Sequence, residues 1–292
     1  MKGGTQKFKS LLMGLVLLLC VSFLLTGCSS EKNSELSYNF KQGSSGLELS
    51  FLPNSPPDKV YPHSNFKIVL KEENKAAYDI TQGKISIIGL DSKYFTLYPQ
   101  DQSFDTLVGR SVVNPAGDSK YAEFDVTSTE LVQNAERYLG NYYLKASYQS
   151  TFEFTDSVCI NPSTYDVYDS GCKISGPKSY SGQGAPVGVV RMEEILSPGN
   201  EVAMELRLEV RNIGTGRVKK ITLGDAKLGG EELECRIKGQ DEKEINLDPD
   251  KQEMMIICTK KLREKNSYTT TLYLDLGYEY ELKEQHSLLM VR

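Results

Sequence analysis

The sequence predicts an all-β protein built from two tandem β-sandwich domains. After residue 46, most of the chain consists of short runs in which apolar and polar residues alternate, separated by turn-forming residues. Two sets of such runs occur, over 47–160 and 187–292, and each has the length of an ordinary sandwich domain. Between them, within 161–186, lies a Gly/Ser/Pro-rich stretch, GCKISGPKSYSGQGAP. We therefore place the domain junction and a disulfide-closed loop in 161–186.

The first 27 residues are typical of an export signal. Three lysines and no acidic residue precede an apolar run, Leu11–Leu25, which is short for a membrane span but suits a signal sequence. The run ends in Leu25-Thr26-Gly27-Cys28, followed by two serines. These residues resemble the lipobox of exported lipoproteins, which implies that Cys28 carries a diacylglyceryl group and begins the mature chain. The alternatives are a plain secretion signal and an N-terminal membrane helix.

Charge and composition narrow the choice of partners. The formal net charge is −5, and removal of the signal with its lysines makes the mature chain more acidic. An acidic chain lacks the basic footprint that nucleic acid requires. We expect no nucleic-acid partner and no cofactor, and we expect membrane attachment only through the lipid on Cys28.

The cysteines also indicate export. Besides Cys20 in the signal and Cys28, the chain has four cysteines. An even number of thiols in an oxidising compartment predicts two disulfides, and the sequence-local pairing is Cys159–Cys172 with Cys235–Cys258. The other two pairings remain open, as does a zinc site with four thiolates, although zinc sites usually contain a Cys-x-x-Cys pair that this chain lacks.

The elements of the first set follow a polar segment, 28–46, that we interpret as a flexible tether. The predicted strands are Leu47–Phe51, Phe66–Lys71, Lys84–Leu90, Tyr94–Tyr98, Tyr121–Val126, Tyr142–Tyr148 and Thr151–Ile160. Thr127–Leu139 is the exception. Thr127 and Glu130 fit a capping box, so this segment predicts a short helix.

The second set alternates more regularly. In Glu201–Arg211, apolar and charged residues alternate over the whole run, which excludes a helical period. Further strands are predicted at Arg217–Leu223, Glu232–Ile237 and Glu253–Thr259. Ser267–Val291 is predicted to be a hairpin that turns around Gly277.

The two sets resemble each other. In both, an alternating strand leads to an asparagine (Asn74 or Asn212), a small-residue turn and a second strand. This pattern is similar to Ig-like modules of the CARDB (cell-adhesion-related) type, whose second strand runs into an Asn-x-Gly-type turn. Asn212-Ile213-Gly214 matches that turn, and Asn74-Lys75-Ala76 matches it in part. The resemblance implies tandem Ig-like modules with a structural or binding role in the envelope.

No catalytic or metal-binding constellation is predicted. The two histidines, His63 and His286, lie in different domains and are expected to be exposed. Asp166 and Asp169 offer too few oxygens for calcium, and the basic run after Lys260 is interpreted as a solvated strand end. Tyrosines gather near the junction, at 142, 143, 148, 165, 168 and 180, where they fit either an interface or ordinary strands.

We therefore expect a lipid-anchored, extracytoplasmic protein at the cell surface or in the periplasm. Its expected role is structural or protein-binding, with an envelope protein as partner, and it is expected not to be an enzyme. Two alternatives remain. The first is a lipoprotein that binds a small solute or glycan between its two domains. The second is an envelope hydrolase, whose paired catalytic carboxylates cannot be recognised in a single sequence.

Overall fold

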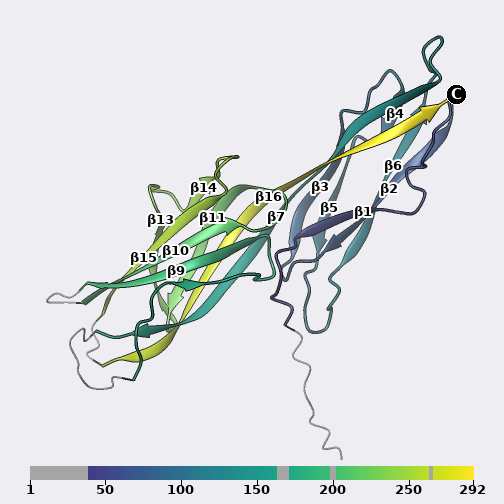
Figure 1. The fold of residues 1–292 in the computed structure, drawn as a ribbon. Helices are drawn as coiled ribbons and strands as arrows, with labels where there is room; N and C mark the ends of the chain where they lie inside the picture. The colour runs from purple at the N-terminus through teal and green to yellow at the C-terminus, as the bar shows by residue number, and fades with distance from the viewer. Residues whose placement is uncertain (1–38, 163–170, 198–201, 263–265) are drawn as a thin grey trace, which may run out of the picture. The chain divides into compact units, whose positions relative to one another are not determined.

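The computed structural model describes residues 39–162, 171–197, 202–262 and 266–292, and within these ranges the chain is all-β (Figure 1). The described residues contain no helix long and apolar enough to cross a bilayer. The strands form antiparallel sheets that pair into two Ig-like sandwiches, so the predicted fold class is confirmed. The signal, Cys28 and most of the predicted tether lie outside the described residues.

The strands of the described chain belong to three sheets. The four-stranded sheet contains, in spatial order, β1 (Leu47–Phe51), β2 (Asn65–Asn74), β6 (Ser119–Ser128) and β4 (Phe95–Tyr98). The five-stranded sheet contains β13 (Glu234–Ile237), β15 (Glu253–Leu262), β10 (Val202–Asn212), β9 (Val187–Ser197) and β8 (Lys178–Ser179). The seven-stranded sheet contains β12 (Glu231–Glu232), β11 (Arg217–Leu228), β16 (Tyr268–Val291), β7 (Arg137–Ile160), β3 (Ile80–Ile88) and β5 (Asp101–Leu107), with β14 (Glu244–Asn246) also paired to β11.

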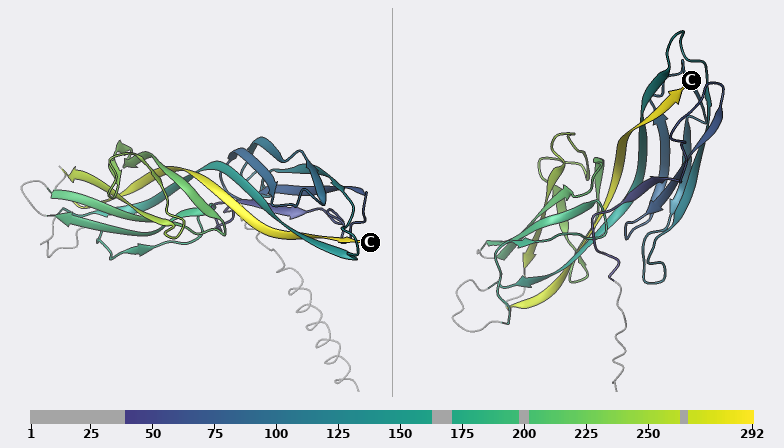
Figure 2. Two further views of the ribbon diagram at one scale, coloured as in Figure 1. Left: turned by 90° about the horizontal axis from the view of Figure 1, so that it is seen from above. Right: turned by 45° about the vertical axis from the view of Figure 1, so that its right-hand side comes forward.

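Two long strands run through both sandwiches. β7 and β16 each have 24 residues and pair antiparallel along their whole length, as Figure 2 shows. On its other side, β7 pairs with β3 only over 143–150, and β16 pairs with β11 only over 272–281. The first half of β7 and the last part of β16 therefore belong to the first sandwich. The remaining halves belong to the second. We call this strand pair the spine.

The spine corrects two predictions. The predicted hairpin at Ser267–Val291 is one strand, because Leu276, Tyr278 and Tyr280 keep the two-residue period across Gly277, which pairs with Thr151 inside the ladder. For the same reason, the predicted strands Tyr142–Tyr148 and Thr151–Ile160 are parts of one strand.

The predicted helix at Thr127–Leu139 is also wrong. Thr127 is still in β6, and its hydroxyl donates to Asn65 Oδ1 at 2.7 Å instead of capping a helix. Asn134 has a φ of 67°, which no helical residue adopts, and β7 begins three residues later. The segment between β6 and β7 is therefore a loop.

The two asparagines of the internal repeat have equivalent roles. Asn74 Nδ2 donates to Tyr78 O at 2.9 Å, and Asn74 Oδ1 accepts from Ala76 N at 2.9 Å. Asn212 makes the equivalent bonds: its Nδ2 donates to Gly216 O at 2.7 Å, and its Oδ1 accepts from Gly214 N at 3.1 Å. In both sandwiches an asparagine side chain thus closes the turn that leads toward the seven-stranded sheet.

The buried apolar side chains of the described residues include members of both sandwiches in one cluster. The predicted units 47–160 and 187–292 each contain strand residues whose partners lie in the other unit, since 282–291 pairs with 137–146. Part of the predicted 161–186 linker forms β8, which pairs with β9.

Candidate functional site

The junction is the part of the spine where β7 and β16 pass from one sandwich to the other. Four tyrosines are buried there: Tyr78, Tyr148, Tyr278 and Tyr280. Burial raises the pKa of Tyr280 to about 12, so its hydroxyl stays protonated and donates to Asn212 Oδ1 at 3.1 Å. The same hydroxyl accepts from Gly216 N at 2.8 Å. Of the tyrosines predicted to gather here, Tyr148 lies in the junction, whereas Tyr165 and Tyr168 lie outside the described residues.

The N-terminal segment enters the described structure at the junction. Lys41 Nζ forms an ion pair with Glu153 Oε2 at 2.9 Å, and Gly43 O accepts from Gly184 N at 2.8 Å. Gly46 packs so closely on the Tyr148 hydroxyl that a Cβ on Gly46 would lie 2.2 Å from that oxygen. Residues 41–46, which were predicted to be part of the flexible tether 28–46, are therefore docked at the junction.

A polar hollow lies on the outer face of the spine at the junction. Its volume is about 310 Å³, and its lining includes Asp79, Thr81, Gln149, Thr222 and Glu279. Lys220 also lines it and lies 3.3 Å from Glu279 Oε1 and 3.6 Å from Glu244 Oε2. Such a lining offers hydrogen-bond donors and acceptors, together with positively and negatively charged side chains, to a small polar molecule.

Glu72 is a buried carboxylate that the sequence prediction missed. Its side chain is on the core-facing row of β2, after Ile68 and Leu70, and only 3% of the residue is exposed. Glu72 Oε2 has no hydrogen-bond partner among the described residues, and burial raises the pKa of the carboxyl to about 7 although Lys120 opposes the shift. The sequence signal was available, because the alternation of β2 places Glu72 on the apolar face.

A second acidic group lies at the edge of the second sandwich. Burial raises the pKa of Glu194 to about 7, while nearby Lys178 opposes the shift. Asp156 accepts from Lys178 Nζ at 2.8 Å and from the Tyr180 hydroxyl at 2.6 Å. Burial alone would raise the pKa of Asp156, but these hydrogen bonds lower it below its ordinary value. Lys178 thereby fastens β8 to β7.

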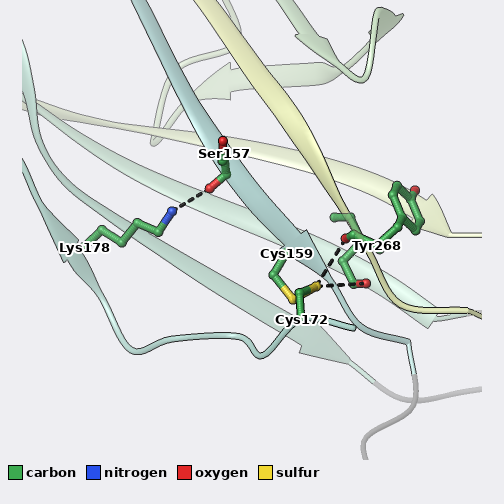
Figure 3. The surroundings of a disulfide bond; sticks show 6 residues. Ser157, Cys159, Cys172, Lys178 and Tyr268 are labelled. Atoms are coloured by element: carbon green, nitrogen blue, oxygen red, sulfur yellow. Dashed lines mark hydrogen bonds between the residues drawn. A yellow bond between two sulfur atoms is a disulfide. The ribbon is translucent and has the colours of Figure 1, made fainter. Parts of the chain in front are cut away.

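The structure forms the two disulfides that the sequence-local pairing gives. Cys159 and Cys172 join the end of β7 to the segment before β8 (Figure 3). In the same view, Lys178 donates to Ser157 O and Cys172 contacts the backbone of Tyr268. Cys235 and Cys258 stand directly opposite each other and link β13 to β15.

The remaining residues singled out from the sequence lie apart from one another. His63 is exposed and lies 3.5 Å from Glu130 Oε1. His286 was expected to be exposed, but it packs edge-on against the Phe51 ring at 4.8 Å, because β16 reaches back into the first sandwich. Lys260 pairs with Glu231 at 2.6 Å. Cys28, Asp166, Asp169 and the end of the basic run lie outside the described residues.

Comparisons with known proteins identify no family. No protein-family model and no curated protein matches the sequence. The secreted serine protease VesC from Vibrio cholerae aligns at 13% identity and a TM-score of 0.21, over 80% of this chain and 50% of the protease chain. The E. coli chaperone DraB aligns at 11% identity and a TM-score of 0.21, over 73% and 86%.

A further solved structure is the Salmonella enterica SafA pilin in complex with the SafB chaperone. It aligns at 9% identity and a TM-score of 0.19, over 86% of this chain and 100% of that chain. The chain therefore spans half the length of the protease and most or all of the two others. The resemblance to CARDB-type modules stays an expectation.

Proposed function

We propose that this chain is a lipid-anchored, extracytoplasmic module that binds a protein partner in the cell envelope and does not act as an enzyme. The observation that carries the proposal is the docking of residues 41–46 at the junction. Lys41 pairs with Glu153 of the second sandwich, and Arg110 of the first sandwich donates to Gln42 O at 2.7 Å. Both sandwiches are thus fixed to the segment that leads to Cys28.

The disulfides and the N-terminal sequence support the location. Two disulfides favour an oxidising compartment outside the cytoplasm. The lipobox-like Leu25–Cys28 supplies the thiol for a lipid. An acidic chain with a lipid anchor is held near the membrane surface, where envelope proteins are available as partners.

Replacing Cys28 tests the anchor. In Cys28→Ser, we expect the diacylglyceryl mass to be missing and the protein to be unprocessed or released from the detergent phase, because Cys28 is the only proposed site of covalent lipid attachment. Cys20→Ser is the matched control and should be lipidated like wild type. The anchor is disproved if Cys28→Ser remains in the membrane fraction with the wild-type mature mass.

The polar hollow favours a second candidate, binding of a small solute or glycan. Thr222→Trp would fill the hollow without touching the core. If the main proposal is right, photo-cross-linking in intact cells from exposed positions of the chain yields a discrete protein adduct, and Thr222→Trp leaves that adduct unchanged. A small molecule that copurifies with the wild-type chain and is lost in Thr222→Trp would instead establish the second candidate.

A further inference from the structure

The loop that joins β5 to β6, residues 108–118, carries an exposed apolar tip. Val113 is 93% exposed and Val112 is 62% exposed, and these are neighbouring residues. We call Val112 and Val113 the valine tip. Single exposed apolar residues are ordinary on protein surfaces, but two adjacent exposed valines at the end of a projecting loop contribute little to the stability of the fold. An apolar binding partner outside the chain would explain them.

The valine tip is held out rigidly. Ser111 N donates to Asn114 O at 2.9 Å and Asn114 N donates back to Ser111 Oγ at 3.0 Å, which closes a turn around the two valines. Below this turn, Asp118 Oδ1 accepts from Asn114 Nδ2 at 3.1 Å, and Asp118 N donates to Val108 O at 2.9 Å. The valines cannot fold back on the sandwich without breaking these bonds.

The loop lies beside the segment that leads to the proposed anchor. Arg110 Nη2 donates to Gln42 O at 2.7 Å, and Figure 1 shows the β5–β6 loop projecting next to the point where the described chain begins. The sequence places Gln42 14 residues after Cys28. Fourteen residues span at most about 50 Å when fully extended. The base of the loop thus stays within that distance of the lipid.

The charges of the loop suit a membrane surface. Residues 109–117, GRSVVNPAG, contain one cation, Arg110, and no acidic residue. Asp118 at the end of the loop is occupied by Asn114 and by Val108 N, which donates to Asp118 Oδ2 at 3.1 Å. Apolar side chains enter the boundary between headgroups and acyl chains, and no acidic residue of 109–117 opposes that entry.

We propose that the valine tip inserts into the headgroup–acyl boundary of the same bilayer that holds Cys28. This inference rests on the proposed anchor. The tip is then a second attachment, which sets the junction against the membrane surface. One acyl attachment alone leaves the orientation of the body free, and a second contact fixes it.

The chain has no tryptophan, so Val113→Trp introduces a single fluorescent reporter at the tip. The mature chain from Cys28 onward is coupled through that thiol to a maleimide-bearing lipid in phosphatidylcholine vesicles, with or without brominated acyl chains. The other four cysteines are in disulfides, so Cys28 is the reactive thiol. We expect a blue shift of the emission on coupling and a loss of fluorescence with brominated lipid. Val112→Trp should behave alike.

Tyr61→Trp is the matched control. Tyr61 is also exposed, and its neighbour Val60 pairs with Leu289 and Val291 near the C-terminus, away from the loop. It should show neither shift nor quenching. If Val113→Trp behaves like this control, the proposal is overturned. A blue shift that needs an envelope protein extract, and does not occur on lipid alone, also overturns it and assigns the tip to a protein partner. Because coupling bypasses cellular lipidation, failure of the anchor and failure of the tip give different results.

Discussion

Two glutamates of the described residues, one buried and one partly buried, have pKa values well above the ordinary range. Glu72 and Glu194 follow apolar residues on core-facing rows, and burial raises the pKa of both to about 7. Within the part of the chain that the structure describes, Oε2 of Glu72 and Oε1 of Glu194 have no hydrogen-bond partner. The ionised carboxylates are therefore costly at neutral pH, and the protein is expected to be more stable when they are protonated.

Glu72→Gln tests this cost. The pKa of Glu72 is about 7 in the folded chain and 4.5 ordinarily, so the folded state holds an extra proton between these values and loses stability as pH rises through them. At about pH 8 the variant should be more stable than wild type, by up to about 3 kcal/mol, and at about pH 4 the difference should vanish.

Urea unfolding at the two pH values measures the difference. Glu48→Gln, an exposed glutamate on the neighbouring strand β1, is the control and should change little at either pH. A Glu72→Gln effect that is equal at both pH values would show that the carboxyl charge is not its cause.

At the scale of elements, the N-terminal segment 41–46 depends on Gly46. A Cβ at this position would lie 2.2 Å from the Tyr148 hydroxyl and 3.2 Å from Pro186 Cγ. In Gly46→Ala we expect a loss of about 1–3 kcal/mol from overpacking, together with faster proteolysis within 41–46 as the segment leaves the junction. Gly176→Ala is the control, because no atom of the described residues lies within 4 Å of its added Cβ. Equal unfolding midpoints and cleavage rates in the two variants would show that the segment is not docked.

The sequence predicts most strands but not how they connect. Alternation identifies β2 and β10, and the sequence-local pairing of the four cysteines gives the two observed disulfides, because each of these features depends on residues that are near one another in the chain. The length of β16 could not be predicted in this way. Gly277 is typical of a turn, but it pairs with Thr151 on β7 and with Thr222 on β11, and these sequence-distant partners keep it inside a continuous strand. Glu72 differs, because the alternation of β2 alone predicts that its side chain faces the core. It was missed because a charged residue is not expected on a core-facing row.

At the scale of the whole molecule, the spine joins the two sandwiches. Pairs such as Tyr148–Tyr280, Ser150–Tyr278 and Phe152–Leu276 continue the ladder through the junction. A linker between two domains would place few contacts there, whereas a shared ladder makes the junction as ordered as either core. This continuity would allow a single anchor and a single tip to orient both sandwiches at a membrane.

Native-state hydrogen exchange tests the shared spine most directly. The ladder amides of 148–152 and 276–280 are expected to exchange as slowly as those in the sandwich interiors, because opening them requires separating β7 from β16. Exposed loop amides in 108–118 provide the fast reference. Slow exchange through the junction would establish the spine. Fast exchange at 148–152 and 276–280, with slow exchange on both sides, would show a flexible linker between two independent domains and contradict this account.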